Sequence, residues 1–310
     1  MTNLKISPKN SKNMGFFFGV AAFCCWGFFP LYWKLFYSTS SLFITNWRVI
    51  FTVITLYFFL FLRKEMGSII EIFKNKKLLT LLIFSNICIS INWFVFIWVI
   101  QLGESWQSSL GYYLSPIVTV LIATLFLKEK LAISTIISCM TATAGIILLF
   151  IEERYFPWYA LLLAISFSAY GLLKKKISIP PYLSLAFEVT TIIPVCLFYL
   201  LWSYFQQTHL APVLNLNIYA SWLILSLSGP LTILPLVLYS RSAQLIPLSN
   251  LGMLQFISPT IQFCIAFFIF QEPFSPHKIS AFFIIWLALL IYILGPLWHL
   301  FRNNSKIKMQ

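Results

Sequence analysis

The sequence predicts an all-helical integral membrane protein with ten transmembrane helices in two inverted five-helix repeats. Of its 310 residues, 60% are hydrophobic and 9% are charged, which is too little polar surface to cover a soluble globule of this length. Apolar runs long enough to cross a bilayer recur along the chain without the alternation of barrel strands, so we expect the spans to be helices. A repeated segment divides the chain into two halves.

This repeat matches residues 115–129 (SPIVTVLIATLFLKE) with residues 258–272 (SPTIQFCIAFFIFQE) at a constant offset of 143 residues. Ser, Pro, Ile, Ala and Glu are identical in the two copies. We therefore expect one five-helix repeat at 15–151 and a second at 156–298, between cytoplasmic tails at 1–14 and 299–310.

The ten spans are expected in order at 15–33, 42–62, 78–100, 106–127, 131–151, 156–173, 181–204, 218–239, 244–270 and 277–298. The first span follows a lysine-bearing start and resembles a signal peptide. Its apolar run is about 19 residues long, is bulky around Trp26 and has no evident small-residue cleavage site, so we expect a retained helix. Residues 67–77 resemble a short interfacial helix with lysines at the headgroups.

Basic residues lie mostly on one side of the predicted bundle. The net charge is +13, from 21 lysine and arginine residues against eight acidic ones. Seventeen of the basic residues fall in the tails and in loops on one side, three fall on the opposite side, and Arg48 lies within a span. By the positive-inside rule, both termini are expected in the cytoplasm. This distribution indicates a lipid bilayer as partner and disfavours nucleic acid.

An odd number of crossings in each half means that the second half inserts upside down relative to the first. Glu129 is then expected to face the cytoplasm and its counterpart Glu272 to face outward. Inverted repeats can exchange the shapes of the two halves, which provides a route to alternating access of a central site. The alternative is that the duplication only builds a bundle.

Several local motifs, placed on this layout, are similar to those of a known family. They are Trp26-Gly27 with Pro30 and Lys34, residues 45–50 around Arg48, Asn92-Trp93, residues 109–112 (SLGY), Pro116, Tyr170-Gly171 followed by lysines, and Glu188. Together they resemble RarD-type permeases of the EamA branch of the drug/metabolite transporter superfamily. The resemblance covers nearly the whole chain and implies a secondary transporter of the bacterial inner membrane. Gln107 stands where family members commonly carry an acidic residue.

Two ionisable residues inside spans are the first candidates for a substrate site. Arg48 lies about six residues into the second span, where a cation tends to face a cavity or a partner. Glu188 lies at a similar depth in the seventh span, the repeat equivalent of the second. We hypothesise that they bind opposite charges of a polar or zwitterionic substrate, or that Glu188 exchanges a proton. The alternatives are snorkelling of Arg48 to the headgroups and structural pairing of Glu188.

Other polar or amphipathic side chains at membrane depth are expected to line a substrate pocket. They are Asn92 and Trp93 on the third span, Tyr112 and Tyr113 on the fourth, and Gln255 and Gln262 on the ninth. Pro116 and Pro259 are repeat mates that each remove a helical hydrogen bond, so we expect them to kink their helices beside the cavity. Each of these residues has helix packing as its alternative role.

The missing motifs limit the remaining functions. No nucleotide-binding G-x-x-x-x-G-K-[ST] occurs, so a gradient or an exchanged solute is expected to drive transport. The chain has no aspartate, no G-x-S-x-G and no H-E-x-x-H, and its cysteines have no C-x-x-C spacing. We therefore expect no enzyme, cofactor or metal. Export of a drug or metabolite, uptake of a host metabolite such as S-adenosylmethionine, and a non-transporting scaffold remain open, as does the oligomeric state.

Overall fold

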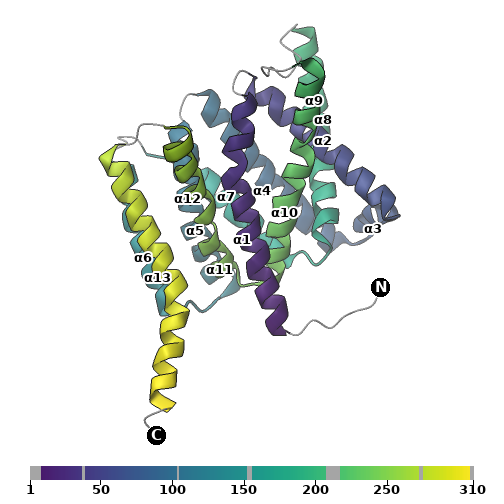
Figure 1. Cartoon of the computed structure of the whole chain (residues 1–310). Coiled ribbons are helices and arrows are strands. Elements are labelled where there is room, and N and C mark those ends of the chain that lie inside the picture. The colour runs from purple at the N-terminus through teal and green to yellow at the C-terminus, as the bar shows by residue number, and fades with distance from the viewer. Residues whose placement is uncertain are drawn as a thin grey trace.

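A computed structural model describes residues 8–36, 39–102, 105–151, 156–206, 217–271 and 275–307. Every regular element in these ranges is a helix, as expected (Figure 1). The elements are α1 (Pro8–Trp33), the 3-10 turn η1 (Lys34–Phe36), α2 (Ser41–Leu62), α3 (Gly67–Lys74), α4 (Lys76–Gln101), α5 (Ser105–Leu127), α6 (Ile133–Ile151), α7 (Trp158–Lys176), α8 (Pro181–Phe205), α9 (Ile218–Ser226), α10 (Ser228–Leu245), α11 (Leu248–Leu254), α12 (Ile257–Cys264), the π-turn η2 (Ile265–Ile269) and α13 (Pro276–Ile307).

Eight helical segments in the described ranges are long and apolar enough to cross a membrane. They correspond to α1, α2, α4, α5, α6, α8, the α9–α10 pair and the run from α11 to η2. In α13 the apolar stretch is shorter, at Ile279–Gly295, and α7 has three lysines in its last turn. The chain is thus an integral membrane protein of helical type.

The ninth expected span begins later than the sequence analysis placed it. Residue 244 was expected to start this span, but α10 continues to Leu245 and α11 starts only at Leu248. Between them Ile246 is extended, because the ring of the following Pro247 disfavours a helical backbone before it. At the two ends of the chain, α1 begins at Pro8 and α13 reaches Ile307, inside the segments expected as tails.

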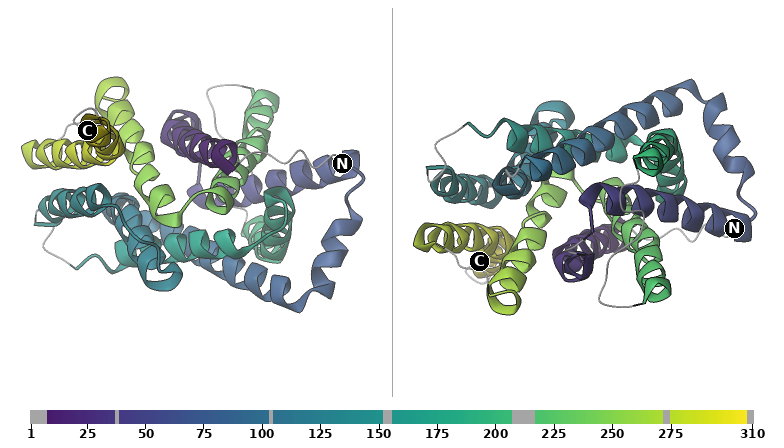
Figure 2. Two further views of the ribbon diagram at one scale, coloured as in Figure 1. Left: turned by 90° about the horizontal axis from the view of Figure 1, so that it is seen from below. Right: turned by 90° about the horizontal axis from the view of Figure 1, so that it is seen from above.

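Helices from the two halves of the chain pack against each other throughout the bundle. In these contacts α1 packs on α10 and α12, α4 and α5 pack on α7, α2 packs on α8 and α10, and α6 packs on α13. Figure 2 shows the yellow α13 at one side of the bundle and the blue α3 at the other. The start of α1 and the end of α13 lie at the same end of the molecule (Figure 1).

Small residues allow several of these helices to approach closely. Gly15 and Gly19 of the G-x-x-x-G segment face Ile246 and Ser242, and the Ser242 hydroxyl donates to the Gly15 carbonyl at 2.7 Å. On α6, the Ser138 hydroxyl donates to a backbone carbonyl of α13 at 2.5 Å. Both contacts therefore lie in seams between helices inside the bundle.

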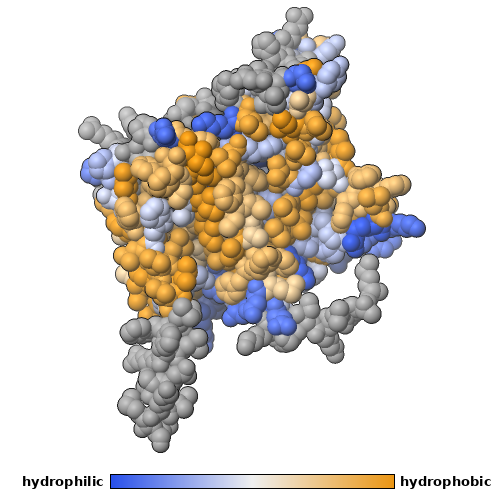
Figure 3. Space-filling view, viewed as in Figure 1, coloured by the Kyte–Doolittle hydropathy of each residue, from blue (hydrophilic) through white to orange (hydrophobic). Residues whose placement is uncertain are grey.

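The outer surface is apolar across the middle of the molecule. Large side chains such as Phe17, Phe58 and Leu125 are more than 60% exposed, at 68%, 62% and 71%. In the face seen in Figure 3, hydrophobic residues fill the centre and hydrophilic ones gather toward the two ends. This is the distribution expected where lipid tails surround a bundle and water meets its ends.

Candidate functional site

A cavity of about 550 Å³ lies between the two halves of the chain. Its walls come from α1, α2, α4 and α5 on one side, and from α7, α10 and the α11–α12 region on the other. Ser115 and Ser258, which are equivalent in the repeat, both line it. The volume is within the usual range for a small-molecule site.

The cavity extends toward the end of the bundle at which α1 stops and α2 starts. Trp33, Phe36, Thr39 and Ile44, which flank this connection, belong to its lining. In Figure 1 α1 reaches this upper end, opposite the start of α1 and the end of α13. The cavity therefore extends toward the end of the molecule remote from these two helix ends.

Arg48 on α2 is partly buried in the cavity wall and lies between two tryptophans. Its Cζ atom is 5.1 Å from the ring centroid of Trp93 and 5.8 Å from that of Trp33, which is the range of cation–π contacts. The Nε atom is buried and has no hydrogen-bond partner. Among the described residues that line the cavity, Arg48 is the single charged side chain.

Gln255 and Thr232 add two further unpartnered polar atoms to the cavity lining. The Gln255 amide nitrogen donates to the Thr119 hydroxyl at 3.0 Å, while its Oε1 atom is buried without a partner. The Thr232 hydroxyl is also buried and unpartnered. Leaving such groups without hydrogen bonds is costly, so these two atoms are unusual features of residues that line the cavity.

Asn92 and Gln262 are held in place by bonds to neighbouring helices. The Asn92 amide donates to the Leu163 carbonyl at 3.0 Å and to the Ser166 hydroxyl at 3.2 Å. The Gln262 amide donates to the Trp26 carbonyl at 3.1 Å. Both side chains therefore connect the halves as well as lining the cavity.

The structure brings together most, but not all, of the residues that the sequence indicated. Arg48, Asn92, Trp93, Tyr112, Gln255, Gln262 and Pro259 line the cavity, whereas Tyr113, Pro116 and Glu188 are not among its described lining. Tyr113 is buried at 7% exposure and its hydroxyl is 3.4 Å from the Pro259 carbonyl. The side chain of Gln107 and all of Glu272 lie outside the described residues.

Pro116 and Pro259 differ in whether their helix is interrupted nearby. Pro116 lies within α5, which is continuous from Ser105 to Leu127. Pro259 lies in α12, just after the break that separates α11 from α12 at Gln255 and Phe256. Pro259 has no N–H group to donate to the Gln255 carbonyl four residues earlier, which favours a break at that point.

Sequence reasoning overlooked Thr232, Ser115, Ser258 and Trp33 as cavity residues. For the two serines a signal was present, since Ser-Pro opens both copies of the repeated segment. No comparable pattern marks Thr232, which lies on α10 away from any motif.

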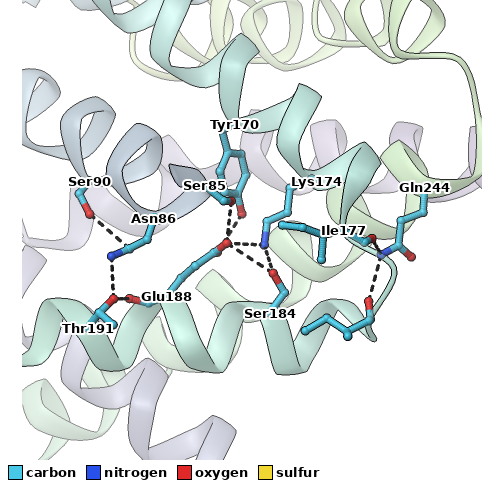
Figure 4. A network of polar contacts seen from close by, with 11 residues as sticks. Ser85, Asn86, Ser90, Tyr170, Lys174, Ile177, Ser184, Glu188, Thr191 and Gln244 are labelled. Atoms are coloured by element: carbon cyan, nitrogen blue, oxygen red, sulfur yellow. Dashed lines mark hydrogen bonds and ion pairs between the residues drawn. The ribbon is translucent and has the colours of Figure 1, made fainter. Parts of the chain in front are cut away.

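Glu188 forms a buried ion pair with Lys174 on the neighbouring helix α7 (Figure 4). The Lys174 Nζ and Glu188 Oε1 atoms are 2.7 Å apart, and each side chain is 1% exposed. The Ser85 hydroxyl on α4 donates to the same carboxylate at 2.8 Å, and the Tyr170 hydroxyl donates to it at 3.3 Å. The charge count placed Lys174, with Lys175 and Lys176, among the seventeen basic residues of tails and loops on one side of the bundle. That expectation was wrong for Lys174, because its ammonium turns inward to Glu188.

A layer of aromatic side chains separates the cavity from this ion pair. Phe23, Trp26 and Phe167 line the cavity, and all three rings lie 5.2–5.9 Å from the ring of Tyr239. Tyr170 stacks on Tyr239 at 6.1 Å with an interplanar angle of 11°. The aromatic layer, defined by these five residues, forms the floor of the cavity.

Below the aromatic layer, polar contacts join the halves at the end where α1 starts. The Glu129 carboxylate accepts bonds from the backbone N–H groups of Leu248 and Ser249 at 2.8 and 2.9 Å, and from the Ser249 hydroxyl at 2.6 Å. Within the second half, the Lys175 ammonium donates to the Ile246 carbonyl at 2.6 Å.

A further contact joins the turn after α2 to the start of α8. The Tyr182 hydroxyl donates to the Glu65 carboxylate at 2.6 Å, and Arg63 forms an ion pair with Glu65 at 3.0 Å. The bond from Tyr182, followed by that from Arg63, holds the pKa of Glu65 below its ordinary value. At this end of the bundle, polar contacts between helices therefore accompany the aromatic layer.

Comparison with known proteins gives consistent matches. Residues 13–151 match the model of the EamA-like transporter family. The uncharacterized transporter YojE of Bacillus subtilis (strain 168) is 40% identical, over 90% of this chain and 93% of that protein. Protein RarD of Streptomyces exfoliatus is 30% identical, over 98% of this chain and 95% of that protein. The chain belongs to the RarD-type EamA transporters. The resemblance seen in the motifs is confirmed.

Membership of this family, together with the apolar helices, makes the chain a multi-pass protein of the bacterial inner membrane. Protein RarD of Escherichia coli (strain K12) is 28% identical over 94% of this chain and 97% of that protein. A protein crystal structure with 15% sequence identity superposes with a TM-score of 0.67, over 92% of this chain and 97% of the other. That likeness supports the fold. The described residues contain no group of three or more potential metal ligands.

Proposed function

We propose that this EamA-family protein is a secondary active transporter that moves a small polar organic metabolite or drug by alternating access. The observation that carries the proposal is the cavity between the halves, which extends toward one end of the bundle and has the aromatic layer as its floor. A non-transporting scaffold does not require a cavity whose lining residues have unpartnered polar atoms. No catalytic constellation accompanies the cavity in the described residues, so we propose transport rather than catalysis.

The proposed architecture has ten crossings, with α7 and α13 added to the eight apolar segments, in repeats at 15–151 and 156–298. The packing supports this arrangement, because contacts occur in equivalent pairs. α4 packs on α7 as α10 packs on α1, and α5 packs on α7 as α12 packs on α1. Such pairing is expected for two inverted repeats related by a pseudo-two-fold axis.

The proposed cycle begins from the state described here. If the excess of basic residues marks the cytoplasmic side, the cavity faces outward and the aromatic layer forms a closed cytoplasmic gate. Lys174 lies seven residues beyond Phe167 on α7, about 10 Å deeper along the helix. We assign Glu188 and Lys174 to this gate, because the bond from Ser85 links the pair to the first half. Opening inward has to break that bond.

Glu188 is also the candidate for proton coupling in this proposal. Its carboxylate lies deep in the bundle and bonds to groups on α4, α7 and α8. Proton exchange there would weaken the attraction to Lys174 and loosen the gate. Flux that depends on a pH gradient in the original protein, and not in a Glu188→Gln variant that still folds, would support this role.

Reconstituted protein provides the test of transport itself. Liposomes are loaded with a defined pool of small metabolites and drugs, including S-adenosylmethionine and chloramphenicol, and efflux and uptake are measured by mass spectrometry. We expect saturable flux of a subset of compounds above that of protein-free liposomes. Saturable flux of none, or equal flux of all, would contradict a transporter.

A matched control comes from the same protein preparation. Ile44 lines the cavity, so an Ile44→Cys variant in a cysteine-free background can be tested before and after modification with a bulky maleimide. We expect modification to stop flux by filling the cavity. Flux that continues unchanged in fully modified protein would place the transport pathway elsewhere.

A further inference from the structure

We propose that the substrate is an organic anion whose carboxylate binds Arg48 and whose apolar body lies among the cavity aromatics. This inference rests on the proposed function only in naming the bound molecule as the transported one. It replaces a zwitterion held between Arg48 and Glu188 with a ligand of net negative charge.

The first argument is the charge of the cavity. Arg48 is the single charged side chain among the described lining residues, and its Nε atom is buried without a partner. By contrast, the buried Lys174 beyond the aromatic layer is paired with Glu188 at 2.7 Å. An unpaired cation within the membrane is costly, so its retention at the cavity indicates an anionic ligand.

The second argument is the way in which Arg48 is held. Trp93 and Trp33 contact the guanidinium through their ring faces at 5.1 and 5.8 Å. Such contacts orient a guanidinium but use none of its five N–H donors. The Nε atom is buried, so the two terminal nitrogens are the donors open to a carboxylate, which can accept two parallel hydrogen bonds.

The remaining lining distinguishes an anion from a cation or a zwitterion. Gln255 Oε1 and the Thr232 hydroxyl are unpartnered and can accept a hydrogen bond from a ligand hydroxyl or N–H group. No carboxylate in the described lining is available to pair with an ammonium group. Phe96, Trp93 and Phe167 offer apolar faces for the rest of the molecule. A carboxylic acid with a flat apolar body fits these features best.

The test compares isosteric ligands that differ in charge. Purified protein in detergent is titrated calorimetrically with phenylacetate, phenylacetamide and phenethylamine, and with the corresponding 2-naphthyl acid, amide and amine. We expect each acid to bind at least about tenfold more tightly than its amide or amine, which is about 1.4 kcal/mol. Equal binding within both series, including absence of binding by all six compounds, overturns the proposal.

Three variants test whether Arg48 causes the preference. Arg48→Gln is expected to reduce the affinity for the acids to that for the amides, while Arg48→Lys retains part of the preference. Lys34→Gln is the control, because Lys34 is exposed beside Trp33 in sequence and its Nζ lies 3.4 Å from the ring centroid of Phe270. An acid preference that survives Arg48→Gln, or that disappears in Lys34→Gln, overturns the assignment.

Flux measurements separate this inference from the proposed function. Acids that bind in an Arg48-dependent manner but do not cross the liposome membrane would leave the anion site intact and contradict transport. Saturable flux of the amides or amines at the same rate as the acids would leave transport intact and contradict the anion site.

Discussion

Arg48 and Lys174 are both cations inside the helical bundle, but only Lys174 has an acidic partner. The Lys174 ammonium contacts Glu188 and Ser184, whereas the Arg48 guanidinium contacts the faces of Trp33 and Trp93. A residue that serves stability is expected to be paired, and a residue that serves binding is expected to be left open. The two residues therefore predict opposite responses to neutralisation.

Neutralising Arg48 should stabilise the protein without ligand. We expect Arg48→Met to raise the free energy of unfolding by about 1–3 kcal/mol, because it removes a desolvated group with an unmet hydrogen-bond donor and keeps most of the side-chain volume. Thermal unfolding in detergent measures the change, with Lys34→Met as the exposed control. A lower melting temperature for Arg48→Met would show that Arg48 stabilises the fold and would contradict the prediction.

Neutralising one member of the Lys174–Glu188 pair should have the opposite effect. Glu188→Gln leaves a buried ammonium without its counterion, and we expect a loss of about 3–5 kcal/mol. The double variant Lys174→Met/Glu188→Leu should recover most of that loss, because it removes both charges. The same unfolding assay compares the three proteins. Additive losses in the double variant would show that the two residues act independently.

At the residue scale, the sequence indicated most of the polar cavity residues, but it did not indicate which side chain pairs with Glu188. Arg48, Asn92 and Gln255 were recognisable because polar groups are rare at membrane depth. The pairing of Glu188 was not predictable, since Lys174 belongs to a lysine cluster typical of a membrane surface. Only the structure, in which Lys174 on α7 reaches Glu188 and Ser184 on α8, shows that its ammonium turns inward.

At the element scale, α2 and α10 approach closely enough that one position requires glycine. A methyl group on Gly229 would lie 2.5 Å from the Phe51 carbonyl oxygen, which belongs to the backbone of α2 and cannot move aside. We expect Gly229→Ala to destabilise the protein by about 1–3 kcal/mol through this overlap. Gly67→Ala at the start of α3 should be tolerated, because nothing lies within 4 Å of the added atom.

The yield of folded protein and its melting temperature measure both glycine variants. Equal behaviour of Gly229→Ala and Gly67→Ala would contradict the close contact between the helices.

At this scale hydropathy predicts which segments are helices, whereas the breaks within them depend on individual prolines. Long apolar runs predict the spans, but the breaks at Leu227 and at Gln255 interrupt runs of uniform hydrophobicity. The second break has a visible cause in Pro259, and it places Gln255 at the cavity wall. The break at Leu227 has a similar cause, since Pro230 has no N–H group to donate to the Ser226 carbonyl four residues earlier.

At the scale of the whole molecule, the proposed orientation and the outward-facing state can be tested together. Ile44 lines the cavity toward the end at which α2 starts, and Arg241 is exposed on α10 toward the opposite end. In a cysteine-free background, we expect a membrane-impermeant maleimide to label Ile44→Cys in intact spheroplasts and Arg241→Cys only after permeabilisation. The reverse labelling pattern would invert the proposed topology. Absence of labelling of Ile44→Cys in intact spheroplasts would contradict an outward-facing cavity.

The unpaired guanidinium of Arg48 also determines which step of a transport cycle senses membrane voltage. A site that holds Arg48 alone carries one positive charge, and the same site with a monoanion bound is neutral. A potential of 100 mV acts on a charge that crosses the whole membrane with about 2.3 kcal/mol. In the proposed cycle, an inside-negative potential would therefore act on the empty carrier and draw its site toward the cytoplasm, while leaving the loaded carrier unaffected.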